Sequence, residues 1–496
     1  MPGIFPERED TGTATTHFTP HISPKDWNRF QIYAPRIKSL CLFTSDFCNG
    51  SDQTSSIQLS YDAWVTLSSC KPPGPLLPNL KQLFWFIPTT TPTETTQAVN
   101  MFLGPKLRVF QLQIDIDQAD PVIEAILHLP WTSPSLQTLG VGYHNRSLCE
   151  RSFLGGRHLQ GLLGGLGHLQ EFRWACVVSP DQLSALLASQ PRSLRRLSVG
   201  LDDDAWGDEG RSPSLAQRQG ETWTLPNLTE LELHARSSLT CSNALRMCNF
   251  PRLAVFVLST ALFPSPMQVF QTLCDTLSHT TLHTITLKDD YTLAPSGTDS
   301  PVLIINPDTL QPLYAFRAMT SISFSEGNTD DYGESRFQFS LNDTAVLELA
   351  MAWPQLKSLR LGPSVWDSTL DNYITLKGLK HLVQHCQYLV ELRISILVTE
   401  PSYFEDTALD IIPTRCNELI TKIDFIDSSI GVDSWDVAAY LHVLFPRLVS
   451  TEMDRYLCER DEGPLEEVEK CLLSIHKAHL WRSRILERGI NITATS

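Results

Sequence analysis

Short apolar motifs of the form apolar-x-x-apolar-x-apolar recur along the chain. One of them, Leu356-x-x-Leu359-x-Leu361, stands directly behind Ala352-Trp353-Pro354. The alternation in its second half is typical of a short β-strand with one buried face and one wet face. We call the first apolar residue of each motif its anchor. The anchors are Ile37, Leu80, Leu107, Leu136, Leu169, Leu194, Leu228, Leu253, Leu282, Met319, Leu356, Leu389, Ile420 and Leu448.

Helical patterns precede many of these motifs, and several of them end in proline, which cannot continue a helix. One helix and one strand cannot bury an apolar face alone, so successive repeats must stack. The sequence therefore predicts an α/β fold, a leucine-rich-repeat solenoid with a curved parallel sheet inside and helices outside. The repeats are irregular, because successive anchors lie 25 to 43 residues apart. The predicted helices lie within 180–191, 266–279, 342–354, 376–387 and 436–446.

These patterns divide the chain into four segments. We expect a disordered segment over 1–22, the solenoid over 23–462, a capping helix over 463–489 and a disordered tail over 490–496. The last helix is amphipathic, and we expect it to cover the exposed edge of the last strand. The alternative is that it docks a helix of a partner.

Composition and charge narrow the choice of partner. The chain of 496 residues carries a formal charge of −16, which repels phosphate backbones and anionic lipid headgroups. Lys and Arg are scattered singly or in pairs, so we expect no nucleic-acid and no membrane partner. We expect a monomer that binds a protein client, and a basic client would suit the charge.

Twelve cysteines without C-x-x-C pairs or framework spacing predict reduced thiols. The first residues contain no apolar leader, and no run of eighteen apolar residues occurs. These features predict a protein of the cytoplasm or nucleus.

Candidate chemistry is sparse. His381 and His385, with Cys386 beside them, have a spacing that can hold zinc, but no third ligand is identifiable, which favours ordinary helix histidines. The glycine-rich run 162–170 lacks G-K-[ST], which favours a tight turn before a strand over a phosphate site. No nucleophile, base and orienting group can be assembled. We therefore expect no enzyme, no catalytic residue, no cofactor and no metal.

Two surfaces remain as candidates for binding a partner. Acidic residues seven to ten positions past their anchors would lie together along one rim of the curved sheet. The simpler interpretation is that they are charged loop residues exposed to solvent. Strand residues that alternate with the buried ones would form the concave face. The rim set is Asp115, Asp117, Asp202, Asp203, Asp204, Asp289, Asp290, Glu326 and Asp427, and the concave set is Phe84, Phe86, Glu230, Glu232, Val255, Val257, Thr284, Thr286, Ser321 and Ser323. From these we predict partner binding by Phe84, Phe86, Glu230, Glu232, Thr284, Thr286, Ser321, Ser323, Asp202, Asp203, Asp204, Asp289 and Asp290.

Three stretches carry a resemblance to a known family. SPKDWNRFQIYAPRIKSL (23–40), FSLNDTAVLELAMAWPQLKSLRL (339–361) and FIDSSIGVDSWDVAAYLHVLFPRL (425–448) resemble the F-box/LRR (F-box-like domain-containing) proteins expanded in mushroom-forming fungi. The likeness spans 23–486. It implies the substrate-recognition part of an F-box-type ubiquitin-ligase adaptor, which positions a client and performs no chemistry itself.

The family's F-box, with a pattern such as L-P-x-E-L-L-x-x-I-F, has no counterpart ahead of residue 23. We therefore expect a Skp-family adaptor as partner only if an F-box is present in the native product. Two alternatives stay open. One is a stand-alone scaffold or inhibitor without a link to ubiquitination, and the other is an enzyme with an unrecognised site.

Overall fold

The computed structural model describes residues 5–8, 14–17, 24–42, 57–59, 61–71, 73–86, 98–114, 119–143, 155–189, 192–206, 223–290, 303–326, 337–362, 373–399, 415–426, 428–452 and 463–487. The chain forms two compact units, Met1–Arg252 and Leu253–Ser496.

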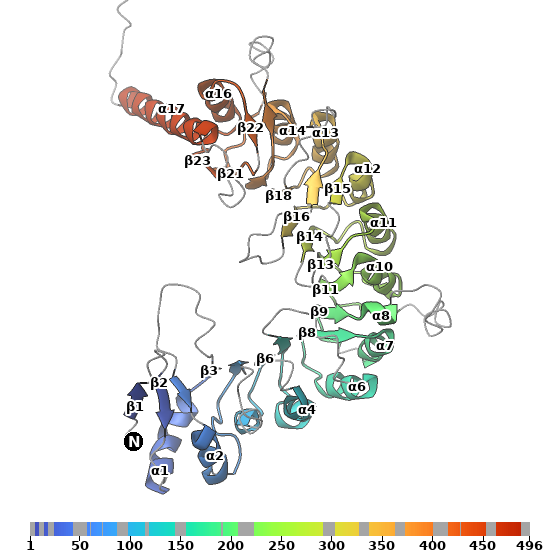
Figure 1. Ribbon diagram of the computed structural model, residues 1–496, viewed down its shortest axis with the longest axis vertical. Helices are drawn as coiled ribbons and strands as arrows, with labels where there is room; N and C mark the ends of the chain where they lie inside the picture. The colour runs from blue at the N-terminus through green and yellow to red at the C-terminus, as the bar shows by residue number, and fades with distance from the viewer. Residues whose placement is uncertain are drawn as a thin grey trace, which may run out of the picture. The chain divides into compact units, whose positions relative to one another are not determined.

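Parallel strands, one per repeat, form the main sheet of the first unit, in the order β3-β5-β6-β7-β8-β9-β11 (Figure 1). These strands are β3 (Ser39–Leu42), β5 (Gln82–Phe86), β6 (Val109–Ile114), β7 (Thr138–Tyr143), β8 (Glu171–Val178), β9 (Arg196–Leu201) and β11 (Glu230–Ser237). The helices are α1 (Pro24–Tyr33), η1 (Ala34–Arg36), α2 (Tyr61–Cys70), η3 (Ala98–Met101), α4 (Ala119–Leu127), α5 (Leu129–Thr132), α6 (Gly156–Gly165), α7 (Pro180–Ser189), α8 (Asp203–Trp206) and α10 (Ser238–Arg246).

Two small sheets accompany the main sheet of this unit. One joins β10 (Trp223–Thr224) to β12 (Cys248–Asn249). The other joins β1 (Phe5–Arg8), β2 (Ala14–His17) and β4 (Ile57–Leu59), so two short strands lie within 1–22, for which the sequence predicts disorder.

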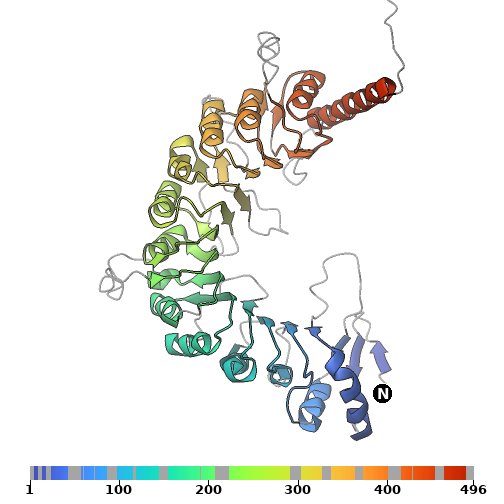
Figure 2. The same cartoon turned by 180° about the vertical axis from the view of Figure 1, so that it is seen from behind.

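Helices lie on one side of this sheet and leave the other face to strand side chains. Figures 1 and 2 show α2, α4, α6 and α7 along the outer side of the first unit, with β5 to β9 along the inner side. This is the layering of a leucine-rich-repeat solenoid, in which each crossover runs through one helix.

Strand pairing follows the repeat found in the sequence. Residues three positions past successive anchors stand side by side in the order Leu83, Phe110, Leu139, Phe172, Leu197 and Leu231. Each is at most 3% exposed, and so are the anchors from Leu80 to Leu228. The predicted register is therefore confirmed, because a shift by one residue would turn these side chains to solvent.

The second unit repeats the design with strands in the order β13-β14-β16-β18-β19-β21-β23. These strands are β13 (Val255–Leu262), β14 (Thr284–Asp289), β16 (Ser321–Glu326), β18 (Ser358–Arg360), β19 (Glu391–Arg393), β21 (Lys422–Asp424) and β23 (Ser450–Glu452). Two short parallel pairs are β15 (Leu303–Ile305) with β17 (Phe337–Phe339) and β20 (Leu397–Val398) with β22 (Ser429–Ile430). The helices are α11 (Pro266–Thr276), α12 (Pro307–Leu310), η6 (Gln311–Ala315), α13 (Asp343–Ala352), α14 (Leu376–His385), α16 (Ser434–Leu444) and α17 (Gly463–Glu487).

The five helices predicted from apolar spacing are confirmed as α7, α11, α13, α14 and α16. Trp353 shows why α13 ends where it does. Pro354 disfavours helix at the preceding residue, and Trp353 turns inward, where it is fully buried and its Nε1 donates to the Leu313 carbonyl at 3.3 Å. The strand that follows then enters the core through Leu356 and Leu359.

Side-chain amides of asparagine residues join consecutive repeats through hydrogen bonds to the backbone. Asn79 donates to the Pro35 carbonyl at 2.8 Å, and Asn227 donates to the Arg192 carbonyl at 2.8 Å. Both residues stand one position before an anchor. In the second unit, buried Asn417 bonds three backbone groups, of Leu389, Leu419 and Ile420, at 2.8–3.0 Å. These bonds pair backbone N–H and C=O groups of the turns, which strand pairing leaves without partners.

The last helix closes the second unit. α17 packs on α16 and β23, and its buried residues are Leu465, Val468 and Leu472. Farther along, Leu480 is exposed. In the described part of the chain, every helix is too short or too polar to cross a bilayer.

Candidate partner-binding surface

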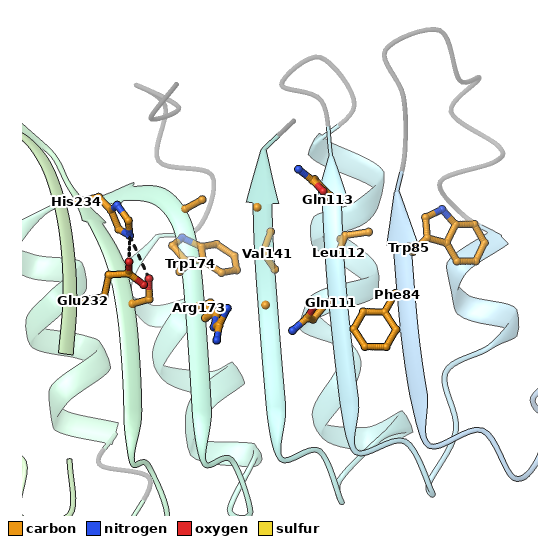
Figure 3. A pocket seen from close by; sticks show the side chains of 14 residues that line it. Phe84, Trp85, Gln111, Leu112, Gln113, Val141, Arg173, Trp174, Glu232 and His234 are labelled. Atoms are coloured by element: carbon orange, nitrogen blue, oxygen red, sulfur yellow. Dashed lines mark hydrogen bonds and ion pairs between the residues drawn. The ribbon is translucent and has the colours of Figure 1, made fainter. Parts of the chain in front are cut away.

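Residues four positions past the anchors form a row across the open face of the first unit's sheet (Figure 3). Each strand from β5 to β9, and β11, contributes one residue, and strand pairing sets these residues next to one another. We call this set the face row. It consists of Phe84, Gln111, Gly140, Arg173, Ser198 and Glu232.

The face row lines a hollow of about 500 Å³. Gly140 and Gly142 of β7 line it, paired with Gln111 and Gln113 of β6, and Gly140 is also paired with Arg173 of β8. Figure 3 shows these three side chains on the strands that flank Val141. A Cβ atom at Gly142 would meet nothing within 4 Å, whereas one at Gly140 would lie 3.3 Å from Cγ of Gln111. The hollow therefore exists because β7 presents no side chain where its neighbours do.

Ion pairs within β8 and between neighbouring strands lie at one end of the face. Glu171 accepts from Nε of Arg173 at 2.6 Å, and Arg196 reaches Glu230 at 2.9 Å and Glu171 at 3.9 Å. Arg173 is 56% exposed and Arg196 52%. Exposed pairs of this kind add little stability, but they hold both charges in defined positions.

The far wall combines a carboxylate, an imidazole and a hydroxyl. Nε2 of His234 lies 3.7 Å from Oε1 of Glu232 and 3.3 Å from Oγ of Ser198, as the dashed lines in Figure 3 mark. The opposite wall is the half-buried Phe84 ring. The hollow thus offers an aromatic side, an amide side and a charged side.

Three polar side chains converge at this wall. Ser198 belongs to β9, and Glu232 and His234 both belong to β11. Among the described residues, no group of three or more His, Cys, Asp or Glu side chains could hold a metal ion.

The predicted binding residues of the first unit divide into two kinds. Phe84 and Glu232 belong to the face row, and Glu230 lies beside it on β11. Phe86 ends β5, paired with Gln113, and its side chain lies outside the described ones.

The acidic rim residues of this unit differ from one another. Asp203 is committed to structure, because its carboxylate accepts from backbone N–H of Arg236 and Ser237 at 2.6 and 3.0 Å and from Oγ1 of Thr240. Burial raises the pKa of this carboxyl, and these hydrogen bonds oppose the rise. Asp202 is half-buried after β9. The side chain of Asp204, and Asp115 and Asp117, lie outside the described residues.

In the second unit, Thr284 and Ser321 stand side by side on β14 and β16, as do Thr286 and Ser323. All four are half-buried on the strand face. With Val255 and Val257 they form an uncharged patch, paired through β13 and β14.

The rim residues of the second unit do not form one exposed group. Asp289 is only 6% exposed, so it cannot serve as a surface charge, whereas Asp290 beside it is half-buried and its N–H donates to Thr260 at 3.1 Å. The Glu326 side chain and Asp427 lie outside the described ones.

Sequence analysis overlooked most of the hollow. Gln111, Gly140, Arg173, Ser198 and His234 were not among the predicted residues, although the alternation rule that selected Phe84 and Glu232 selects them too. Every member of the face row stands four positions past an anchor, so this signal was present in the sequence.

The two histidines considered as zinc ligands lie on α14. His381 and His385 lie one turn apart, and burial lowers the pKa of His381. Nδ1 of His381 is buried and has no hydrogen-bond partner in the structure.

No family model matches the chain, and no curated protein matches it. Among solved structures, a chain of the yeast Rad7 and Elc1 complex is similar over 70% of this chain and 76% of its own length, at 14% identity and a TM-score of 0.36. The leucine-rich repeat-containing protein LegL7 of Legionella pneumophila is similar over 88% of this chain and 97% of its own length, at 12% identity and a TM-score of 0.33.

Proposed function

We propose that the chain is a protein-binding solenoid and that the open face of its first unit holds a segment of a partner protein. The observation that carries this proposal is the hollow over Gly140 and Gly142 beside the Phe84 ring. Glycine lets another backbone approach the sheet closely, and an aromatic wall supplies an anchor.

The lining groups favour an extended segment of mixed polarity. Gln111 and Gln113 can both donate to and accept from a peptide backbone, because each amide carries both functions. Glu232 can pair with a basic side chain of the partner, in line with the basic client expected from the charge of the chain. An apolar side chain of the partner would fill the space above Gly142.

A glycine replacement tests this proposal without disturbing the core. In Gly142→Tyr the ring would occupy the hollow, and the open space at its Cβ position leaves the strand unstrained. Gly164→Tyr on α6 is the matched control, since a Cβ there also meets nothing within 4 Å and the residue is exposed on the helix side. Peptides would be selected on the wild-type chain from a displayed random library, and their dissociation constants measured for all three proteins.

We expect Gly142→Tyr to weaken the selected peptides at least tenfold and Gly164→Tyr to leave them unchanged. Equal affinity for both variants would contradict the proposal, provided that both melt like the wild type.

We further propose that this surface selects clients for a ubiquitin ligase. The support is the resemblance of residues 23–40, 339–361 and 425–448 to F-box/LRR proteins. Capture of the full chain from its own cells, followed by mass spectrometry, tests this part separately. Skp-family and cullin subunits should co-purify with wild type and Gly142→Tyr alike. Absence of every ligase subunit from both captures, with clients retained on the wild type, would instead indicate a stand-alone scaffold.

A further inference from the structure

Basic residues line the amino ends of the first strands of the first unit. Lys38, Lys81 and Arg108 each stand one position past an anchor, and each occupies the turn that enters its strand. The N–H of Lys81 donates to the Lys38 carbonyl at 2.8 Å, and the N–H of Arg108 donates to the Lys81 carbonyl at 2.8 Å. The three residues are therefore direct neighbours on three adjacent strands, although 43 and 27 residues separate them in sequence.

Two more cations extend this row. Nζ of Lys106 donates to Oδ1 of Asn79 at 2.6 Å, which holds it beside Lys81. The Arg36 guanidinium lies over the Tyr33 ring, 5.4 Å from its centroid. We call these five residues, Arg36, Lys38, Lys81, Lys106 and Arg108, the basic edge, and all five are exposed.

Acidic residues are absent from the segments that build this edge. Residues 34–42, 73–86 and 98–114 contain these five cations and no Asp or Glu. The first acidic residues after β3, β5 and β6 are Asp46, Glu94 and Asp115, which follow the carboxyl ends of those strands. Stacking thus brings cations that are scattered along the sequence together at one edge.

The two halves of the chain also differ in charge. Residues 1–252 hold 21 Lys and Arg against 23 Asp and Glu, whereas residues 253–496 hold 18 against 32. The first half is therefore nearly neutral, and the basic edge is not cancelled by a strongly acidic background.

An apolar pair adjoins the edge. Ile32 is 60% exposed and Tyr33 47%, both at the end of α1 next to Arg36. Exposed apolar and aromatic side chains bordered by cations are the usual anchors of a protein interface.

We propose that the basic edge, with Ile32 and Tyr33, docks a short acidic segment of a second protein, one that carries an apolar residue among its carboxylates. The cations span two strand spacings, about 10 Å, which matches a few residues of peptide. A nucleic-acid strand would need a longer track with several aromatic faces for its bases, and Tyr33 is the one aromatic residue of the proposed set.

Two triple charge-reversal variants, one at the edge and one as control, test this docking surface. Lys38→Glu, Lys81→Glu and Arg108→Glu together remove the edge charge, whereas Lys357→Glu, Lys377→Glu and Lys477→Glu change the net charge equally at exposed positions of the second unit. The probe is a fluorescent oligoglutamate peptide with one central tryptophan, titrated into the full chain at low and moderate salt. A second edge variant with glutamine at the same three positions guards against unfolding by repulsion.

We expect the edge variants to lose at least tenfold in affinity, the control triple to lose less than twofold, and wild-type binding to weaken as salt rises. An equal loss of affinity in both triple variants would overturn the proposal, because the loss would then follow from net charge alone. Tighter binding of a single-stranded oligonucleotide of equal charge through the same residues would overturn it in favour of nucleic acid. Tyr33→Ala should weaken the tryptophan peptide more than a peptide without tryptophan, and equal effects would also contradict the docking surface.

Discussion

At the residue scale, polar side chains in this chain serve either the backbone or the surface, and the sequence alone does not separate the two. Asp203 and Glu232 both appeared as candidate binding residues. Asp203 accepts hydrogen bonds from a neighbouring strand end, whereas Glu232 faces the hollow. The difference depends on the course of the chain around α8 and α10, which no short sequence window encodes.

Asn417 is the buried polar residue whose loss should cost most. It is 3% exposed, and its amide bonds three backbone groups that would otherwise be unsatisfied. We expect Asn417→Ala to lower the free energy of unfolding by about 3 kcal/mol, because buried polar groups would remain unpaired. Chemical denaturation measures this, with Asn227→Ala, which loses one exposed bond, expected to cost under about 1 kcal/mol. Similar losses for both variants would contradict this role.

His442 should make stability depend on pH. Burial, and the neighbouring His479 and His476 of α17, hold its pKa below the ordinary value of 6.5. The unfolded chain therefore binds a proton first as pH falls, so stability present above pH 6.5 is lost below it. We expect the melting temperature to fall between pH 7 and pH 5.5, and to fall less in His442→Gln than in the surface variant His168→Gln. Parallel curves for the two variants would rule out this contribution.

At the element scale, the apolar rows explain what was predictable. From Leu80 onward, the anchors and the residues three positions after them are buried. This periodicity is visible in the sequence because the two faces of each strand differ in polarity. Helix ends were also predictable, since proline and N-cap residues such as Asn342 mark them.

The glycine-rich run 162–170 was predictable only in part. The predicted turn before a strand lies at residues 167–168, ahead of β8, but the first part of the run is the end of α6, which continues to Gly165, where a Cβ would lie 2.6 Å from Cβ of Pro130. The missing side chain at Gly165 permits close packing against Pro130, a tertiary requirement that sequence spacing does not reveal.

Leu359 tests the register of the second unit. It is 1% exposed on β18, between Ile322 and Leu392 of the adjacent strands. We expect Leu359→Ala to lower the free energy of unfolding by about 3 kcal/mol, from lost burial and the cavity left behind. Leu480→Ala, at a position 45% exposed, should cost less than about 1 kcal/mol. A Leu359 variant as stable as the Leu480 variant would contradict the register.

At the scale of the whole molecule, repetition turns scattered residues into surfaces. The face row takes one residue per repeat, four positions past the anchor, and the basic edge takes residues that directly precede or follow an anchor. Their existence could be predicted once the anchors were known, but their character could not. That depends on which strand lacks a side chain, as β7 does at Gly140, and on which charges meet across strands.

The most direct test of the central claim is site-specific photo-crosslinking in intact cells. A photoreactive amino acid would replace Gln111, at the hollow, or Gln160, exposed on α6 on the helix side. We predict a discrete protein adduct from position 111 that is absent from position 160 and absent when Gly142→Tyr is added. Adducts of equal yield from both positions, or an adduct at 111 that Gly142→Tyr leaves unchanged, would contradict binding at the open face of the first unit.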